Sequence, residues 1–236
     1  TATTPCGLVI HGGAGVIDRR SLTPEREAEF HAALARIATA AWTRLLAGAP
    51  ALDVVESAVR DLEDDPLFNA GRGAVLNADG VVEMDASIMD GRTRRGGAVA
   101  AVRTAMHPVS LARAVMERTE HVLLVGEGAE RLAGTIGAER APQPYFITAE
   151  RAEQQRLAAR QGKVTLDHDP LFNVPDPKDK RGTVGAVARD ANGHLAAATS
   201  TGGMTNKHPG RVGDTPIVGA GTWAEDATCA VSATGH

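Results

Sequence analysis

The chain has 236 residues, of which 43% are hydrophobic and 23% charged, enough apolar side chain for one large domain or two small ones. The net charge is −4 and no long basic run occurs, which excludes nucleic acid as the expected partner. No apolar run reaches the ~20 residues of a membrane-spanning helix, and no secretory signal is visible. Cys6 and Cys229 match neither a metal spacing nor a disulfide framework. We therefore expect a globular, cytoplasmic protein that does not bind membranes.

The first segment predicts a strand, a glycine turn and a long helix. GLVIHGGAG (7–15) has the pattern of a short buried strand that runs into the turn. Thr23 and Pro24 are typical of an N-cap followed by the first helical position. Apolar residues then recur at helical spacing and predict a helix that ends near Gly48: Phe30, Leu34, Ile37, Ala41 and Leu45.

The middle of the chain alternates between helical and strand patterns. Helices are predicted at ALDVVESAVRDLED (51–64), PVSLARAVMERT (108–119) and AERAEQQRLAARQG (149–162), and strands at VVEMDASIMDG (81–91) and GGAVAAVR (96–103). HVLLVGEGAE (121–130) predicts a strand that enters a helix. The stretch 163–182 has no periodicity, several prolines and many charges, which is typical of a mobile linker.

The last third predicts strands joined by glycine-rich loops: TVGAVARD (183–190), HLAAATST (194–201) and CAVSATG (229–235). Asn192-Gly193 lies where a tight turn would join the first two strands, which favours antiparallel pairing. Strands that flank helices rather than alternating with them predict an α+β fold with helices packed on sheets.

Thr183 is the first candidate catalytic residue. An ordinary threonine hydroxyl is a weak nucleophile and needs a neighbouring base. If the Gly182-Thr183 bond is cut, Thr183 gains an α-amine with a reference pKa of ~7.7–8.0, which can act as that base. A flexible preceding linker would let the new chain end move away. The alternative is that Thr183 only starts a strand.

Arg211 and Asp214 are candidate binding residues in TSTGGMTNKHPGRVGD. A guanidinium can bind a carboxylate bidentately and a carboxylate can hold an ammonium, so the two suit the head group of an α-amino acid. A local ion pair on a surface loop explains the same spacing equally well. Asp85 and Asp90 alternate with apolar residues and are interpreted as structural, and the histidines lack metal-ligand spacing.

Several long motifs occur in a family's order: HGGAG, LFNAGRGAVLNADG, EMDASIMDG, GTVGAVA, TSTGGMTNKHPGRVGD, VGAG and SATG. Together they resemble the isoaspartyl peptidase/L-asparaginase family, the plant-type asparaginases among the N-terminal nucleophile hydrolases. The resemblance spans essentially the whole chain. It implies an αββα sandwich and a precursor that cuts itself between Gly182 and Thr183.

The resemblance also implies roles for individual residues. Thr183 would be the nucleophile, with Thr201 orienting or activating it, and Thr234 and the Gly235 N–H would lie at the oxyanion. The implied substrate-binding residues are Arg211 for the α-carboxylate, Asp214 for the α-amine, and Asn69 in the pocket. A sodium ion would be held by the main-chain carbonyls of Leu62, Glu63, Asp65, Phe68, Ala70 and Arg72.

The expected activity is hydrolysis of L-asparagine and β-aspartyl dipeptides, with small molecules as substrates. We expect no catalytic cofactor, and the family implies a dimer of αβ units. Residues 1–182 would belong to the α subunit and 183–236 would begin the β subunit. Because family members continue beyond SATG, the sandwich is expected to be truncated at its C-terminus. The alternatives are a glycosylasparaginase, or an inactive, unprocessed scaffold that binds an amino acid.

Overall fold

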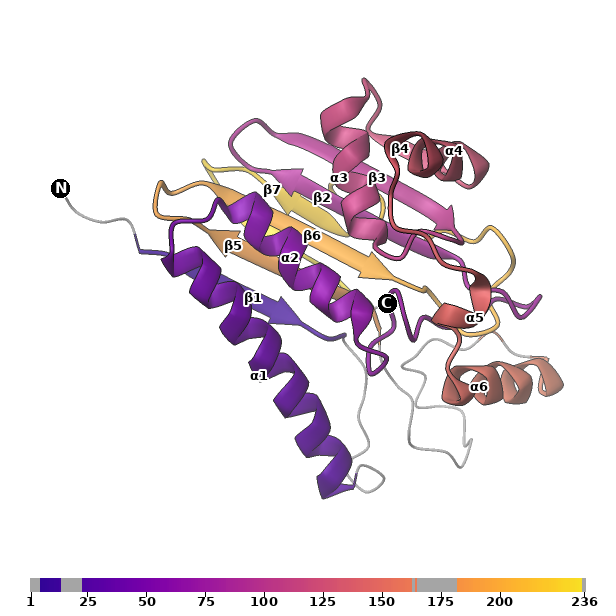
Figure 1. Cartoon of the computed structure of the whole chain (residues 1–236). Coiled ribbons are helices and arrows are strands. Elements are labelled where there is room, and N and C mark those ends of the chain that lie inside the picture. Colours follow the sequence, from indigo (N-terminus) through magenta and orange to yellow (C-terminus); the bar gives the residue numbers. More distant parts are fainter. Residues whose placement is uncertain (1–4, 14–22, 163, 165–181, 235–236) are drawn as a thin grey trace.

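A six-stranded sheet forms the centre of the structure, a computed structural model that describes residues 5–13, 23–162, 164 and 182–234 (Figure 1). Its neighbours are antiparallel except for the last pair, which is parallel. The strand order is β1 (Gly7–His11), β5 (Val184–Arg189), β6 (Leu195–Thr201), β2 (Met84–Asp90), β3 (Arg95–Val102) and β4 (Leu123–Val125). A second, two-stranded sheet pairs β7 (Thr222–Ala224) with β8 (Ala230–Ser232).

Three helices pack on one face of the six-stranded sheet (Figure 1). They are α1 (Pro24–Leu46), α2 (Ala51–Asp64) and α3 (Pro108–Arg118). The remaining helices lie in the connection toward residue 162: α4 (Glu127–Ile136), α5 (Gln143–Phe146) and α6 (Ala149–Arg160). At the start of α1, Thr23 Oγ1 accepts a hydrogen bond from the Arg26 N–H, which confirms the predicted N-cap.

Alternation along β6 divides the core into two layers. Ala196 and Ala198 belong to the large core beneath the helices. Ala197 points the other way and packs with Met89 and Ala224, beneath the β7–β8 sheet. The central sheet is therefore covered by helices on one face and contacted by a second sheet on the other.

The α+β class and the antiparallel pairing across Asn192-Gly193 are confirmed. The structure adds α5 and β7, which the sequence patterns did not predict. Apart from residues 164 and 182, the predicted linker 163–182 lies outside the described residues. Within the described ranges, no helix combines the length and apolar character needed to cross a membrane.

Candidate active site

Thr183 lies immediately before β5 and is only 8% exposed. The β5–β6 ladder pairs Val184 with Ser200, so the next position along each strand places Thr183 opposite Thr201. On its other side Thr201 pairs with Asp85 of β2. The two threonines that were expected to act together are therefore neighbours on the central strands.

The glycine turn after β1 packs directly on the bond that precedes Thr183. Gly13 has φ +125°, and a Cβ there would lie 2.6 Å from the Gly182 nitrogen and 2.9 Å from its oxygen. Only glycine allows this approach and this backbone conformation without displacement. The turn therefore contributes main chain to the candidate cleavage site.

Asn69 ties the loop after Thr201 to the loop after α2. Its main-chain oxygen accepts from the Gly202 N–H (3.0 Å), and its Nδ2 donates to the Gly203 oxygen (2.9 Å). Its Oδ1 accepts from the Val75 N–H (2.9 Å). Asn69 is fully buried, and these bonds fix the glycine loop that follows Thr201.

Arg211 and Asp214 do not form the local ion pair that the sequence left open. Both lie in the described range 182–234, where no ion pair joins them. Asp214 is exposed, and Arg211 is half-buried with its guanidinium close to Gly213. The segment is anchored by the residue that precedes β2, because the Gly210 N–H donates to Glu83 Oε2 at 2.9 Å. Neither side chain is therefore neutralised by the other.

Lys207 is a charged residue of this region that sequence reasoning missed. It is fully buried, and its Nζ donates to the Glu83 oxygen at 2.8 Å. Burial lowers the pKa of Lys207, and the charges of Asp85 and Glu83 oppose that effect. Burial raises the pKa of Asp85, which Lys207 and Arg211 oppose. A lysine in a polar glycine loop is usually exposed, so no sequence signal marked it.

Thr234 follows β8 and is half-buried. The preceding residue is fixed by a hydrogen bond from the Ala233 N–H to the Gly221 oxygen at 2.9 Å. Gly235, the other expected oxyanion residue, lies outside the described residues.

The loop after α2 turns main-chain oxygens toward two glycines. A Cβ at Gly71 would lie 2.3 Å from the Glu63 oxygen, and a Cβ at Gly73 would lie 2.6 Å from the Pro66 oxygen and 2.8 Å from the Phe68 oxygen. Two of the oxygens expected to hold sodium also accept hydrogen bonds within the loop, that of Glu63 from the Arg72 N–H (2.7 Å) and that of Asp65 from the Phe68 N–H (3.1 Å). Oxygen-only lining suits a hard cation, and the sodium site stays a prediction. Within the described ranges, no group of three His, Cys, Asp or Glu side chains could hold a metal.

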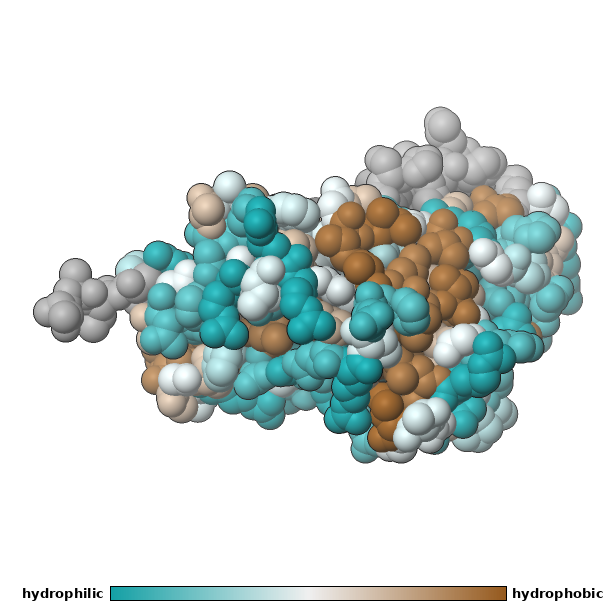
Figure 2. All heavy atoms as spheres, turned by 90° about the horizontal axis from the view of Figure 1, so that it is seen from above, coloured by the Kyte–Doolittle hydropathy of each residue, from teal (hydrophilic) through white to brown (hydrophobic). Residues whose placement is uncertain are grey.

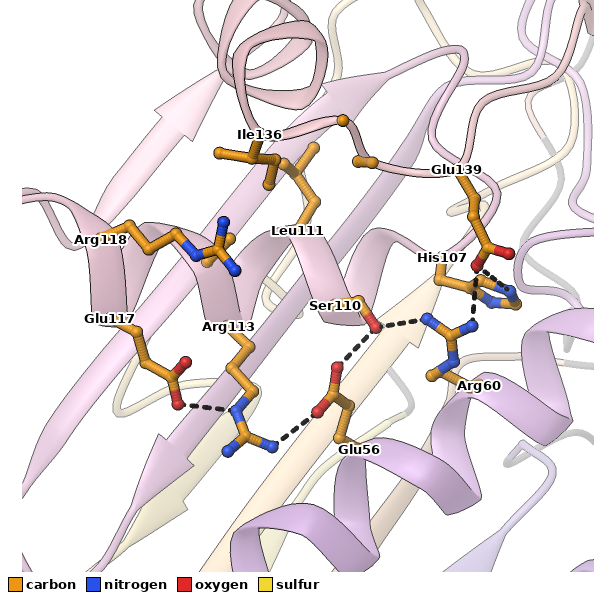
Figure 3. Close-up of a pocket in the computed structure, with 13 residues that line it drawn as sticks. Glu56, Arg60, His107, Ser110, Leu111, Arg113, Glu117, Arg118, Ile136 and Glu139 are labelled. Carbon is orange, nitrogen blue, oxygen red and sulfur yellow. Dashed lines mark hydrogen bonds and ion pairs between the residues drawn. The ribbon is translucent and has the colours of Figure 1, made fainter.

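A separate cavity of about 390 Å³ lies on the helix side, between α2, α3 and the segment after α4 (Figure 3). Its charges largely neutralise one another. Arg113 contacts Glu56 (2.6 Å) and Glu117 (2.7 Å), and Arg60 contacts Glu139 (2.8 Å), as Figure 3 shows. The predicted nucleophile and head-group residues are not among the residues that line this cavity.

His107, which lines this cavity, is linked through Glu63 to β6, the strand that carries Thr201. His107 Nδ1 lies 3.5 Å from Glu63 Oε2, and Glu63 Oε1 accepts from the Ser200 hydroxyl at 2.6 Å. Burial raises the pKa of Glu63, while its contacts with His107 and Ser200 lower it by less. The side chain of Glu63 thus braces β6 next to the candidate site.

Residues 4–236 match the model of the protein family described as asparaginase. The chain belongs to the asparaginase family. It is 54% identical to the isoaspartyl peptidase of Salmonella typhimurium over 97% of this chain and 72% of that protein. It is 52% identical to the isoaspartyl peptidase of Escherichia coli, over 97% and 70% of the two chains. The isoaspartyl peptidase/L-asparaginase of Bos taurus is 46% identical, over 97% and 70%.

Proposed function

We propose that this protein is an isoaspartyl peptidase/L-asparaginase that cuts its own chain before Thr183. Relatives with these activities in their names align with 97% of the chain at 46–54% identity. The observation that carries the site assignment is the buried Thr183, opposite Thr201, with the Gly13 turn packed on Gly182. The relatives' names favour this activity over that of a glycosylasparaginase.

Self-cleavage converts one residue into nucleophile and base. The Thr183 hydroxyl attacks the Gly182 carbonyl carbon, the peptide C–N bond breaks, and the resulting ester is hydrolysed by water. Thr183 is then left with a free α-amine that can take up the proton of its own hydroxyl.

Substrate hydrolysis uses the same hydroxyl. Its oxygen attacks the β-carbonyl of asparagine or of a β-aspartyl dipeptide, ammonia or an amino acid leaves, and water releases aspartate from Thr183. Arg211 binds the substrate α-carboxylate and Asp214 its α-amine. Thr234 and the Gly235 N–H hold the oxyanion, Thr201 orients Thr183, and Asn69 keeps the adjoining loop in place.

The fold is assigned to the αββα sandwich of N-terminal nucleophile hydrolases, with residues 1–182 in the α subunit and 183 onward in the β subunit. The helix layer and two sheets support this assignment. A sodium ion at the 62–72 carbonyls would brace the loop that carries Asn69.

Apolar residues gather on one face (Figure 2), and burying such a surface would favour a dimer of αβ units. Free Cys6 and Cys229 suit the reducing cytoplasm.

Mass spectrometry and N-terminal sequencing of purified protein test this function. The wild-type protein should yield a fragment that begins at Thr183 and should release aspartate from β-aspartyl dipeptides faster than from glycosylated asparagine. Thr183→Ala should stay uncut and inactive, while Thr228→Ala, an exposed threonine of the same segment, should behave as wild type. Activity of a fully uncut protein, or of Thr183→Ala, would refute the proposal.

A further inference from the structure

A row of hydroxyl groups, half-buried at Ser232 and otherwise buried, begins at His11, at the end of β1. His11 Nε2 lies 2.9 Å from Ser232 Oγ, although the two residues are 221 positions apart in the chain. Ser232 Oγ lies 2.7 Å from Thr199 Oγ1, which lies 2.6 Å from Thr222 Oγ1. This row of hydroxyl groups therefore crosses from β1 through β8 and β6 to β7.

The row of hydroxyl groups ends next to Asp214, the residue proposed to bind the substrate amine. Thr222 Oγ1 lies 2.7 Å from Ser87 Oγ of β2, and Ser87 Oγ donates to the Thr215 carbonyl oxygen at 2.6 Å. Thr215 directly follows Asp214. One continuous set of contacts thus joins the neighbourhood of Thr183 to the Asp214 segment.

The number of protons limits which of these bonds can form together. Each hydroxyl has one proton, and a carbonyl can only accept. Ser87 can therefore donate either to the Thr215 oxygen or to Thr222 Oγ1, but not to both. The Thr222 hydroxyl donates to Thr199 Oγ1, and the Thr199 hydroxyl donates to the Gly221 oxygen at 3.1 Å.

The two contacts of Ser232 then decide where the histidine carries its proton. Thr199 already donates to the Gly221 oxygen, so the Ser232 proton goes either to Thr199 Oγ1 or to His11 Nε2. A proton on Nε2 lets Ser232 accept from His11 and donate to Thr199, and of the six contacts only that between Ser87 and Thr222 is then left without a proton. An unprotonated Nε2 would leave two contacts of the set without a proton.

His11 has a restricted protonation state and position. Burial lowers the pKa of His11, and contact with the Thr183 main chain raises it by less, so the ring is neutral near neutral pH. Its Nδ1 is buried and makes no hydrogen bond. A Cβ at position 185 would lie 1.8 Å from Ser232 Oγ and 2.6 Å from His11 Nε2, so Gly185 makes room for this contact.

We propose that Ser232, Thr199, Thr222 and Ser87 form a positioning network for the hydrolase reaction. The network holds His11 against the Thr183 main chain with the ring proton on Nε2. It also links the end of β1, where His11 lies, to the segment that contains Asp214. The kinetic consequence rests on the function proposed above, whereas the position of the ring proton does not.

Nitrogen-15 NMR of histidine-labelled protein tests the position of the proton directly. The two ring nitrogens of each tautomer have distinct shifts, and His11→Gln identifies the His11 signals by their loss. We expect a neutral ring with its proton on Nε2 in the wild-type protein, and a mixture of tautomers in Ser232→Ala. A proton on Nδ1 in the wild type would mean that the ring donates toward Thr183, and it would overturn the proposal.

A matched pair at Thr199 tests the reaction. Thr199→Val keeps the shape and removes the hydroxyl, whereas Thr199→Ser keeps the hydroxyl and removes a methyl group. We expect Thr199→Val to lower kcat/KM about tenfold and Thr199→Ser to stay close to wild type. If both variants fold cooperatively and Thr199→Ser is no better than Thr199→Val, the hydroxyl has no positioning role.

The two ends of the network should affect different kinetic constants. Ser232→Ala acts next to His11 and should mainly lower kcat, while Ser87→Ala frees the Thr215 carbonyl and should mainly raise KM. Equal changes in both constants would contradict a positioning role at either end. An inactive wild-type protein would instead refute the proposed function, and the NMR result would still decide where His11 holds its proton.

Discussion

Replacing Gly13 with alanine should slow self-cleavage without unfolding the protein. A Cβ at Gly13 would lie 2.6 Å from the Gly182 nitrogen, whereas comfortable carbon contacts begin at about 3.5 Å. Gly182 must therefore move by roughly 0.9 Å if the turn stays in place. A misplacement of about 1 Å in a reacting group can cost about 100-fold in rate. The φ of +125° adds about 1–3 kcal/mol of strain.

The assay is intact-mass spectrometry of freshly purified precursor at successive times. Gly13→Ala should cut about 100-fold more slowly than wild type. Gly7→Ala is the control, because it changes a glycine of the same β1 segment whose Cβ would meet its nearest atom only at 4.0 Å. It should cut at the wild-type rate.

Thermal unfolding must be cooperative in both variants, so that a slow rate reflects geometry and not loss of structure. Wild-type cleavage by a folded Gly13→Ala would refute the reasoning. It would show that Gly182 does not need its present position for the bond before Thr183 to break.

Three further substitutions test other parts of the site. Arg211→Lys keeps the charge but loses bidentate binding and should raise KM about tenfold or more, with kcat less affected, in steady-state assays. Glu83→Gln should cost about 1–3 kcal/mol near neutral pH. Burial raises the pKa of Glu83, but Arg103 and its other partners lower it more, so this difference in stability should vanish as pH falls through the lowered pKa. We expect the wild-type protein to have a higher Tm in sodium chloride than in choline chloride at equal ionic strength. Gly71→Ala should abolish this difference in Tm. Gly80→Ala should retain it, because Gly80 also has a positive φ but faces open space.

The regular elements were predictable because their signals are local. The apolar spacing of 51–64 gave both ends of α2 correctly, and Thr23-Pro24 marked the start of α1. β7 has only three residues, too few for any periodicity to show. Its position depends on packing against β6 and β2, which no local pattern records.

The candidate site was only partly predictable for the same reason. Thr183, Thr201 and Arg211 could be placed through long motifs whose order is visible in the chain. Lys207 could not, because its burial depends on the Glu83 oxygen as acceptor and on the charges of Asp85 and Glu83, which are distant in the sequence. The hydrogen bond from His11 to Ser232 could not be predicted either, because the row of hydroxyl groups behind it lies on four strands that are far apart in the sequence.

Glycines explain why so much of the site consists of main chain. At Gly13, Gly185 and Gly202 an added Cβ would come within 2.6 Å of an atom from a distant segment. Each of these positions therefore lets two segments approach closer than any side chain would permit. At Gly13 the neighbouring atoms are the main chain of Gly182, whereas at Gly185 and Gly202 the nearest atoms belong to side chains that hydrogen bonds hold in place, those of Ser232, His11 and Asn69. The distances around Thr183 are consequently set by close backbone approach and by hydrogen-bonded side chains. A nucleophile that must first attack its own chain and then a separate substrate needs distances that stay constant between the two reactions.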